Sequence, residues 1–147
     1  MSRPPPARRA DFAAFIGITT RWRDNDVYGH VNNAVYYEYV DTAVNGWILR
    51  EGLLEIPGGA VVGLVVASSC TYHAPLAFPD PVTAGLRVGR IGSSSVTYEV
   101  GLFRGEAEVA AAEASFTHVY VGAGDHRPVP LPPRFRAGLE TLLREAV

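Results

Sequence analysis

Apolar and polar residues alternate over several stretches of the chain, which is the pattern of strands with one buried face. The alternation is clear over residues 82–89 and again over 96–103. Residues 15–22 are rich in β-branched and aromatic side chains, and 60–74 and 107–121 form two longer stretches of the same character. The sequence therefore predicts five strands.

A different spacing follows the polar, turn-forming segment 23–32. From Asn33 to Arg50 apolar residues recur every three or four positions, which predicts a long helix. Asn32 or Asn33 can cap its first turn, because an asparagine side chain accepts hydrogen bonds from free backbone N–H groups. The apolar arc is wide, so we expect most of this helix to be covered.

The order of these elements defines a fold class. One strand precedes the long helix, four strands follow it, and a short amphipathic helix is predicted over 134–146 after a Pro/Gly-rich connector. This is an α+β arrangement, with one long helix against one antiparallel sheet. Residues 1–11, rich in proline and arginine, are expected to form a flexible tail, and residues 12–147 a single domain.

Composition narrows the classes of protein. Hydrophobic residues make up 48% and charged residues 19% of the 147 residues, as in a globular domain. The single cysteine, Cys70, excludes an internal disulfide and a multi-cysteine metal cluster. All 13 basic residues are arginine, which excludes lysine-based covalent chemistry, and the net charge of −2 argues against a nucleic-acid surface. No apolar run approaches the roughly 20 residues of a membrane span, so we expect a cytoplasmic protein.

Candidate chemistry is concentrated between residues 24 and 33. Two carboxylates, Asp24 and Asp26, and the imidazole of His30 precede a predicted helix N-terminus. The unpaired N–H groups there can polarise a carbonyl, and a carboxylate beside them can attack it or deprotonate a water molecule. The alternative is that these residues only shape a turn and cap a helix, which is their commoner use.

The segment Arg21 to Asp41 reads RWRDNDVYGHVNNAVYYEYVD. It resembles the active-site segment of the hotdog-fold acyl-CoA thioesterases, specifically the 4-hydroxybenzoyl-CoA thioesterase-like family. That pattern has a strand ending in arginine, two spaced aspartates, Gly-His-Val-Asn-Asn, and a helix with spaced aromatics and an acid. Residues 72–76, 79–82 and the Gly-Ser-Ser-Ser run at 92–95 are similar to later pieces of the family.

The resemblance implies a hotdog fold, in which a curved antiparallel sheet of about five strands wraps the long helix. It implies dimers formed by edge pairing of sheets, often paired again into tetramers, with active sites at the dimer interface. It also implies that Asp26 is the catalytic carboxylate and that a backbone N–H near Asn33 polarises the thioester carbonyl. Some branches have Tyr or His in place of Asn33, and the Gly-His-Val-Asn-Asn form belongs more to the long-chain or general acyl-CoA branch.

The other candidate residues have less specific signals. His30 either positions water or Asp26, or packs within the loop. The residues expected to contact substrate are Tyr28, Gly29, Asn32, Gly92, Ser93 and Ser94. Candidates for the coenzyme A phosphates, each also interpretable as a solvated charge, are Arg87, Arg90, Arg104 and Arg127. Asp24 is expected to pair with Arg21 or Arg23, while Asp41 either contacts the active-site loop or is a buried polar group.

These observations favour an acyl-CoA thioesterase that releases a free acid and coenzyme A. A thioesterase for acyl carrier proteins and a non-catalytic acyl-CoA-binding module are the alternatives. The histidines at 73, 118 and 126 have no metal-ligand spacing with a carboxylate, so we expect no metal, and no cofactor apart from the coenzyme A of the substrate. The expected partners are the acyl-CoA and further copies of the chain, as a dimer or a dimer of dimers, with no nucleic acid.

Overall fold

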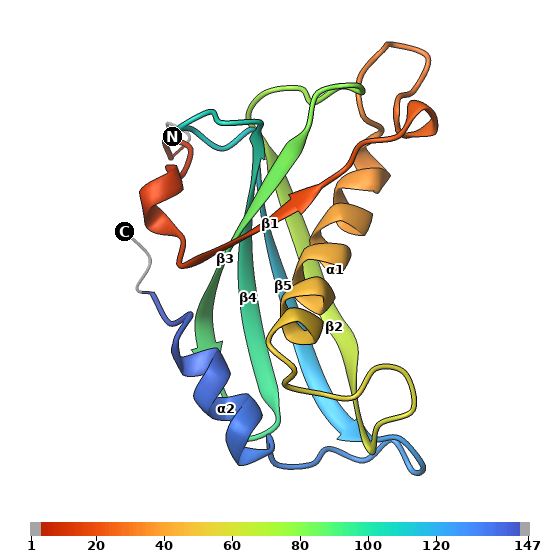
Figure 1. Cartoon of the computed structure of the whole chain (residues 1–147), viewed down its shortest axis with the longest axis vertical. Coiled ribbons are helices and arrows are strands. Elements are labelled where there is room, and N and C mark those ends of the chain that lie inside the picture. Colours follow the sequence, from red (N-terminus) through yellow and green to blue (C-terminus); the bar gives the residue numbers. More distant parts are fainter. Residues whose placement is uncertain (1–3, 145–147) are drawn as a thin grey trace.

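The computed structural model describes residues 4–144, which form one five-stranded antiparallel sheet and a long helix (Figure 1). The strands are β1 (Ala14–Ile18), β2 (Val61–Tyr72), β3 (Val82–Ile91), β4 (Ser95–Arg104) and β5 (Ala112–Gly122), and the helices are α1 (Asn33–Arg50) and α2 (Pro133–Glu140). The order across the sheet is β1-β3-β4-β5-β2. The predicted α+β class is confirmed.

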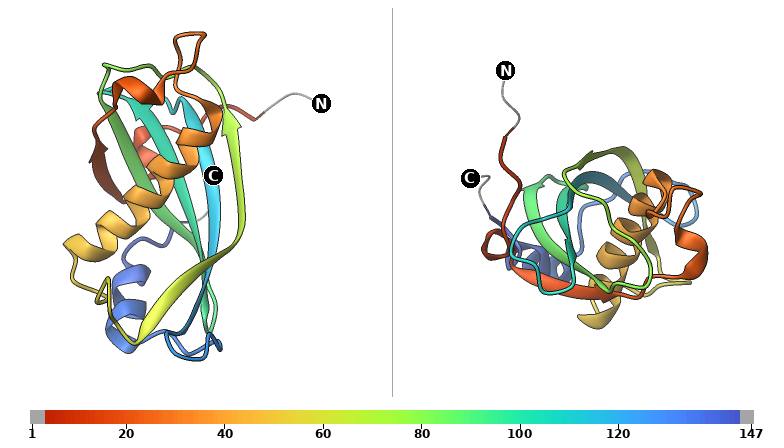
Figure 2. Two further views of the ribbon diagram at one scale, coloured as in Figure 1. Left: turned by 90° about the vertical axis from the view of Figure 1, so that its right-hand side faces the viewer. Right: turned by 90° about the horizontal axis from the view of Figure 1, so that it is seen from above.

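Helix α1 lies against the concave face of the sheet, which curves around it (Figure 2). Its buried side chains recur every three or four residues and are Tyr36, Tyr39, Val40, Ala43, Val44, Trp47 and Ile48. The inward residues of β4 are at most 1% exposed and are Val96, Tyr98, Val100 and Leu102. Burial of these two apolar faces against each other supplies the main stabilisation of the domain.

The bounds predicted for α1 are confirmed at both ends. The side chain of Asn32 accepts a hydrogen bond of 2.9 Å from the N–H of Ala34, which makes Asn32 the N-cap. Gly52, with φ of 63°, lies in the turn that ends the helix. A polar cap, a long periodic stretch and a glycine are strong local signals, and here they agree.

The strand predicted over 15–22 is wrong beyond Ile18. β1 pairs with β3 from Ala14↔Leu86 to Ile18↔Val82, and the partner strand begins at Val82. The residue before it is Pro81, which has no N–H to continue a ladder. The chain instead forms a short 3-10 turn at Trp22–Asp24, and the aromatic Trp22 that suggested a strand is 83% exposed.

Two other predicted elements are longer than those observed. The strand over 107–121 begins only at Ala112, because residues 107–111 follow a turn at Gly105 and lie against the N-terminal segment. The helix over 134–146 ends at Glu140, since the chain then runs beside β3, where the N–H of Val88 donates to the carbonyl of Leu142 at 2.8 Å. Residues 145 and 146 lie outside the described part of the chain.

The segment before β1 packs on the outer face of the sheet. Phe12 covers Gly85 and Gly101, which are paired across β3 and β4. A Cβ at Gly101 would lie 2.7 Å from the Phe12 ring, so the ring occupies space that only glycine leaves free. Ala7 also donates its N–H to Glu113 Oε2 at 3.0 Å. The part of the predicted tail from Ala7 onward is therefore bound to the sheet.

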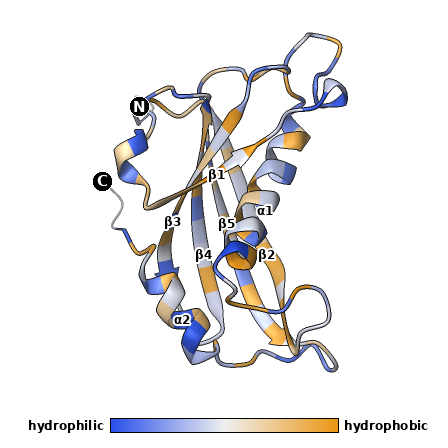
Figure 3. Cartoon of the chain, viewed as in Figure 1, coloured by the Kyte–Doolittle hydropathy of each residue, from blue (hydrophilic) through white to orange (hydrophobic). Residues whose placement is uncertain are grey.

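β2 is an edge strand with an unusual degree of exposure. Residues 63–69 are all exposed, on both faces of the strand. They include Leu64, Val65 and Val66, which are 41%, 48% and 60% exposed. Figure 3 shows hydrophobic residues along this strand. Proteins usually cover a long apolar edge strand of this kind with another segment or another chain.

Candidate active site at the start of the long helix

The segment between β1 and α1 folds back on itself. Asn25 and Val31 form an antiparallel bridge, and the N–H of Asp26 donates to the carbonyl of His30 at 2.8 Å. The N–H of Asn32 donates to the carbonyl of Asp24 at 2.9 Å. These bonds hold Asp24 and Asp26 beside the residues that immediately precede α1, so the two carboxylates and the helix start are brought together.

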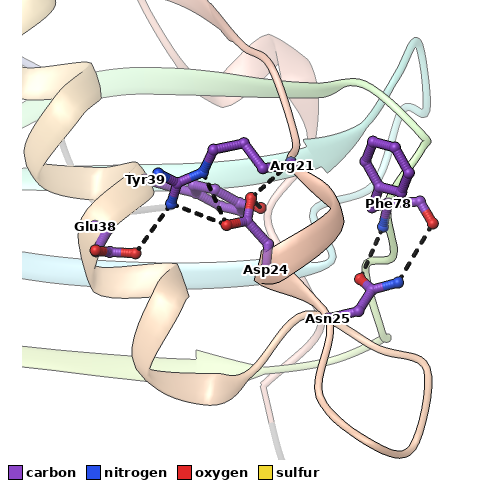
Figure 4. A network of polar contacts seen from close by, with 6 residues as sticks. All are labelled: Arg21, Asp24, Asn25, Glu38, Tyr39 and Phe78. Carbon is purple, nitrogen blue, oxygen red and sulfur yellow. Dashed lines mark hydrogen bonds and ion pairs between the residues drawn. The ribbon is translucent and has the colours of Figure 1, made fainter.

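Asp24 is the anchor of this loop (Figure 4). It is fully buried, and its Oδ2 accepts hydrogen bonds from the Tyr39 hydroxyl at 2.7 Å and the Arg21 N–H at 2.9 Å. Its Oδ1 accepts from Arg21 Nε at 3.0 Å, and Arg21 Nη2 lies 2.9 Å from the same oxygen. Of the two arginines expected as partners, Arg21 is the one that pairs.

These contacts determine the charge of Asp24. Burial alone would raise the pKa of its carboxyl, but the hydrogen bonds from Tyr39 and Arg21, together with the positive charge of Arg21, lower the pKa below its ordinary value. Asp24 is therefore ionised at neutral pH. Because both its oxygens are occupied, Asp24 is a structural group and has no free oxygen for chemistry.

A second side chain ties the loop to the rest of the molecule. Asn25 Oδ1 accepts the N–H of Phe78 at 2.9 Å, while Asn25 Nδ2 lies 3.4 Å from the carbonyl of Phe78. Figure 4 shows this two-bond contact on the far side of the loop from Arg21. The sequence gives no sign of it, since 53 residues separate the partners.

Asp26 differs from Asp24 in having a free oxygen. It is half-buried, and its Oδ1 accepts the N–H of Tyr28 at 2.8 Å. Among the residues that the structure describes, no hydrogen bond reaches Oδ2. The carboxylate is thus oriented by one bond and keeps one oxygen for a water molecule or a substrate carbon.

The first N–H of α1 is available as a hydrogen-bond donor. The second and third, on Ala34 and Val35, donate to the side chain and carbonyl of Asn32. Within residues 4–144 no acceptor is bonded to the N–H of Asn33. The carbonyl of Asn33 accepts a 3.0 Å bond from the Tyr72 hydroxyl, whose pKa is raised by burial to about 12, so that it remains a neutral donor.

The tip of the loop is exposed. Gly29 has φ of 83°, a conformation that glycine adopts without strain, and its N–H donates to the carbonyl of Asp26 at 3.1 Å. Tyr28 is 84% exposed and His30 is also exposed. Tyr28, Gly29 and His30 therefore lie next to Asp26, and the packing of His30 within the loop is not observed.

The other predicted substrate contacts lie far away within one chain. The carbonyl of Ser94 accepts a hydrogen bond from the N–H of Tyr120 near the end of β5. Ala112, at the other end of β5, pairs with Tyr72 beside the start of α1 and lies eight residues from Tyr120. Eight strand residues span about 26 Å. Figure 1 shows this turn between β3 and β4 near α2, at the opposite end of the sheet from the loop. One chain does not bring Gly92, Ser93 and Ser94 to Asp26.

Two of the arginine candidates are engaged elsewhere. Arg87 is buried on the outer face, with Nε 3.0 Å from Glu99 Oε1, and Arg104 Nη2 lies 2.9 Å from Asp80 Oδ2. Asp41 is exposed and accepts from Asn45 on its own helix, so neither interpretation of Asp41 holds.

Residues 4–144 contain neither a metal-binding cluster nor a membrane-spanning helix. They contain no cluster of three or more His, Cys, Asp or Glu side chains suited to a metal ion. No helix in this part of the chain has the length and apolar character needed to cross a membrane.

The chain belongs to the thioesterase-like superfamily, whose family model matches residues 20–139. This range contains the loop, α1 and the whole sheet apart from β1. The match confirms the resemblance based on the segment Arg21 to Asp41, and with it the hotdog fold. Membership of this superfamily supports thioester hydrolysis as the general reaction. No curated protein sequence matches the chain.

Solved structures agree with this assignment. The PA5185 protein of Pseudomonas aeruginosa is 49% identical, with a TM-score of 0.94 over 98% of this chain and 100% of that one. PA2801 of the same species, provisionally named a thioesterase, is 32% identical, with a TM-score of 0.81 over 87% and 98% of the two chains. A Thermus thermophilus thioesterase complexed with coenzyme A and Zn is 28% identical, with a TM-score of 0.71 over 90% and 95%.

Proposed function

We propose that the protein hydrolyses acyl-CoA thioesters to a free acid and coenzyme A. Two groups at the ends of one short loop carry the proposal. Asp26 has a half-buried carboxylate with a free oxygen, and Asn33 has a backbone N–H without an acceptor at the start of α1. The coenzyme A bound to the Thermus relative supports the choice of carrier.

In this reaction the thioester carbonyl oxygen accepts the Asn33 N–H, which stabilises the negative charge that develops as the carbonyl carbon is attacked. Asp26 removes a proton from water, the water oxygen bonds to the carbonyl carbon, and the C–S bond breaks. Coenzyme A leaves as the thiol after taking up the proton. Direct attack by Asp26, followed by hydrolysis of the resulting anhydride, gives the same products.

We further propose that the active protein is a dimer formed by pairing of the two β2 edges. The exposed apolar residues of β2 and its unpaired side support this arrangement. A partner would also bring further residues to the loop, and Gly92, Ser93 and Ser94 remain candidates for that contribution. A second pairing into a tetramer is compatible with the same edge contact.

The substitution Asp26→Asn tests the mechanism. An asparagine oxygen can still accept the Tyr28 N–H, so the loop is kept while the negative charge is removed. We expect kcat/KM for a panel of acyl-CoA esters, followed by thiol release, to fall on the order of 100-fold or more, the effect of losing a catalytic group of this kind.

Asp125→Asn is the matched control. Asp125 Oδ1 accepts the N–H of Arg127 at 3.0 Å, which is the same two-residue turn contact, in the loop after β5. Within one chain this loop lies at the opposite end of the sheet from Asp26 (Figure 1). This variant should keep the wild-type rate. Full activity of Asp26→Asn would rule out its catalytic role. A folded wild type that hydrolyses no member of the panel would favour a carrier-protein substrate or a binding module.

A further inference from the structure

A cavity of about 180 Å³ lies further along α1, between the C-terminal half of that helix, the segment 54–58 and the strands β2 and β5. Most of its wall is apolar, including Ile48, Leu54 and Val61, while the polar residues include Asp41 and His118. An apolar cavity with a few convergent polar groups is the usual form of a small-molecule site. Its volume suits a short chemical group and excludes a nucleotide.

His118 is the unusual member of this wall. It lies on β5 between Phe116 and Tyr120, in the row of side chains that faces the core, and is only 4% exposed. Its Nδ1 has no hydrogen-bond partner among the described residues, although almost all buried polar atoms of proteins have one. The ring packs edge-on against Tyr98, with 5.1 Å between centroids. A ligand in the cavity could supply the partner that the protein lacks.

The charge of His118 narrows the chemistry of that partner. Burial lowers the pKa of the imidazole, and the negative charge of Asp41 opposes this only in part, so the ring is neutral at neutral pH. A neutral imidazole has one donor and one acceptor nitrogen, and either nitrogen can be the donor. The ring can also lie in two orientations related by a half-turn, which exchanges the position of each nitrogen with that of a carbon. A hydroxyl group, which both donates and accepts, can bond to the ring in any of these states.

The position of the cavity links it to the reacting group. Asn33 and Asp41 are eight residues apart on α1, which corresponds to about 12 Å along the helix axis. An extended acyl chain of medium length that begins at the Asn33 N–H would reach the cavity with its far end. This step rests on the proposed function, because it takes the substrate to be a thioester held at that N–H.

We propose that the cavity receives the far end of the acyl group and that the imidazole of His118 bonds a hydroxyl group carried there. The substrate class is then a medium-chain acyl-CoA with a terminal or near-terminal hydroxyl. A terminal carboxylate is disfavoured, because the wall contains the acidic residues Asp41 and Glu55 and no arginine. A terminal methyl group leaves His118 without a partner.

Three coenzyme A esters of equal chain length test this preference: decanoyl-CoA, its ω-hydroxy derivative and the corresponding ω-carboxy ester. We expect wild-type kcat/KM to be roughly tenfold higher for the hydroxy ester than for decanoyl-CoA, the effect of bonding an otherwise unpaired buried group. The carboxy ester should be the poorest of the three.

His118→Phe removes both ring nitrogens and keeps a planar aromatic side chain. It should abolish the preference for the hydroxy ester and leave hydrolysis of butanoyl-CoA, which is too short to reach the cavity, at the wild-type rate. Thr117→Val is the control on the same strand, because Thr117 lies next to His118 and its Oγ1 bonds instead to Thr97 Oγ1 at 3.0 Å. This variant should keep the preference.

Nitrogen-15 resonances of the imidazole give a second measurement that needs no hydrolysis. Pentan-1-ol should shift the His118 resonances, identified by their loss in His118→Phe, and pentane should not. Equal hydrolysis of the hydroxy and plain esters, a preference that survives in His118→Phe, or no shift with the alcohol would each overturn this inference. Failure to hydrolyse any ester would instead overturn the proposed function, and the assignment of the cavity to an acyl group with it.

Discussion

At the scale of single residues, Asp24 and Asp26 are two positions apart and have different environments. Asp24 is buried and bonded through both oxygens to Arg21 and Tyr39, whereas Asp26 is half-buried and bonded through one. The first fixes the loop and the second retains an oxygen that can react. The catalytic role proposed for Asp26 depends on this support, because small errors in the position of a reacting group cost much of the rate.

The buried carboxylate makes a specific stability prediction. Asp24→Asn should lower the free energy of unfolding at neutral pH by about 1.5–3 kcal/mol, the usual value of hydrogen bonds to a charged group. Because the pKa of Asp24 is lowered in the folded protein, its contribution is present above the ordinary value of 3.8 and is lost as the pH falls through the lower, folded value. The difference between wild type and variant should therefore narrow below pH 3.8.

Urea unfolding at a series of pH values measures both effects. Asp80→Asn is the control, since Asp80 forms an exposed ion pair with Arg104 and its loss should cost less than about 1 kcal/mol. A difference between wild type and Asp24→Asn that stays constant from neutral to acid pH would contradict the assignment of an ionised, bonded Asp24.

Residue-level contacts are the part of the site that the sequence predicts least. The pairing of Asp24 with Arg21 is local and was among the expected alternatives. Two other contacts depend on how α1 and the loop lie on the sheet: the bond from the Tyr39 hydroxyl to Asp24, and the contact of Asn25 with Phe78. No pattern along the sequence predicts them. His118 was missed for a similar reason, because its position in an alternating strand is that of an ordinary core residue.

At the scale of elements, α1 was predictable at both ends and β1 was not. The helix carries its own signals, an asparagine cap and a periodic apolar face. A strand ends where its partner ends, and β1 stops opposite Val82, the first residue of β3, because Pro81 immediately before that strand has no N–H to donate. Strand limits are therefore set by residues distant in the sequence, which also explains the late start of β5.

The paired glycines of β3 and β4 give a prediction at this scale. Gly101→Ala places a methyl group 2.7 Å from the Phe12 ring and should displace the segment before β1. We expect a loss of about 1–3 kcal/mol in the free energy of unfolding, typical of overpacking. The loss is measured by chemical denaturation.

Gly17→Ala provides the comparison, because a Cβ at Gly17 on β1 would have no heavy atom within 4 Å. Its effect should stay within about 0.5 kcal/mol. If the two alanine variants were equally stable, the close approach of Phe12 to the sheet would be wrong.

At the scale of the whole molecule, the exposed β2 edge is the basis of the proposed dimer. Val66→Asp should prevent two edges from pairing, because a carboxylate would be buried without a partner in the contact. We expect sedimentation velocity to show a dimer for wild type and a monomer for this variant. Thioesterase activity should fall with dissociation if the site is shared between copies.

Val109→Asp places the same charge on a valine that is 40% exposed and lies outside β2, so it should leave the mass of the assembly unchanged. A wild-type protein that sediments as a monomer at all concentrations would contradict the edge contact. The sequence predicted the sheet and the order of elements along the chain. It did not predict that Gly92, Ser93 and Ser94 lie at the opposite end of the sheet from Asp26 within one chain.

The single thiol of the chain has a practical consequence. Cys70 lies in β2 and is half-buried, and burial raises the pKa of its thiol, so it is a poor nucleophile at neutral pH. Colorimetric thiol reagents should therefore react with the thiol of released coenzyme A faster than with the thiol of Cys70. At higher pH the same residue accepts one nitroxide label for each chain. Pulsed electron paramagnetic resonance between two such labels would then measure the separation of the two edge strands directly.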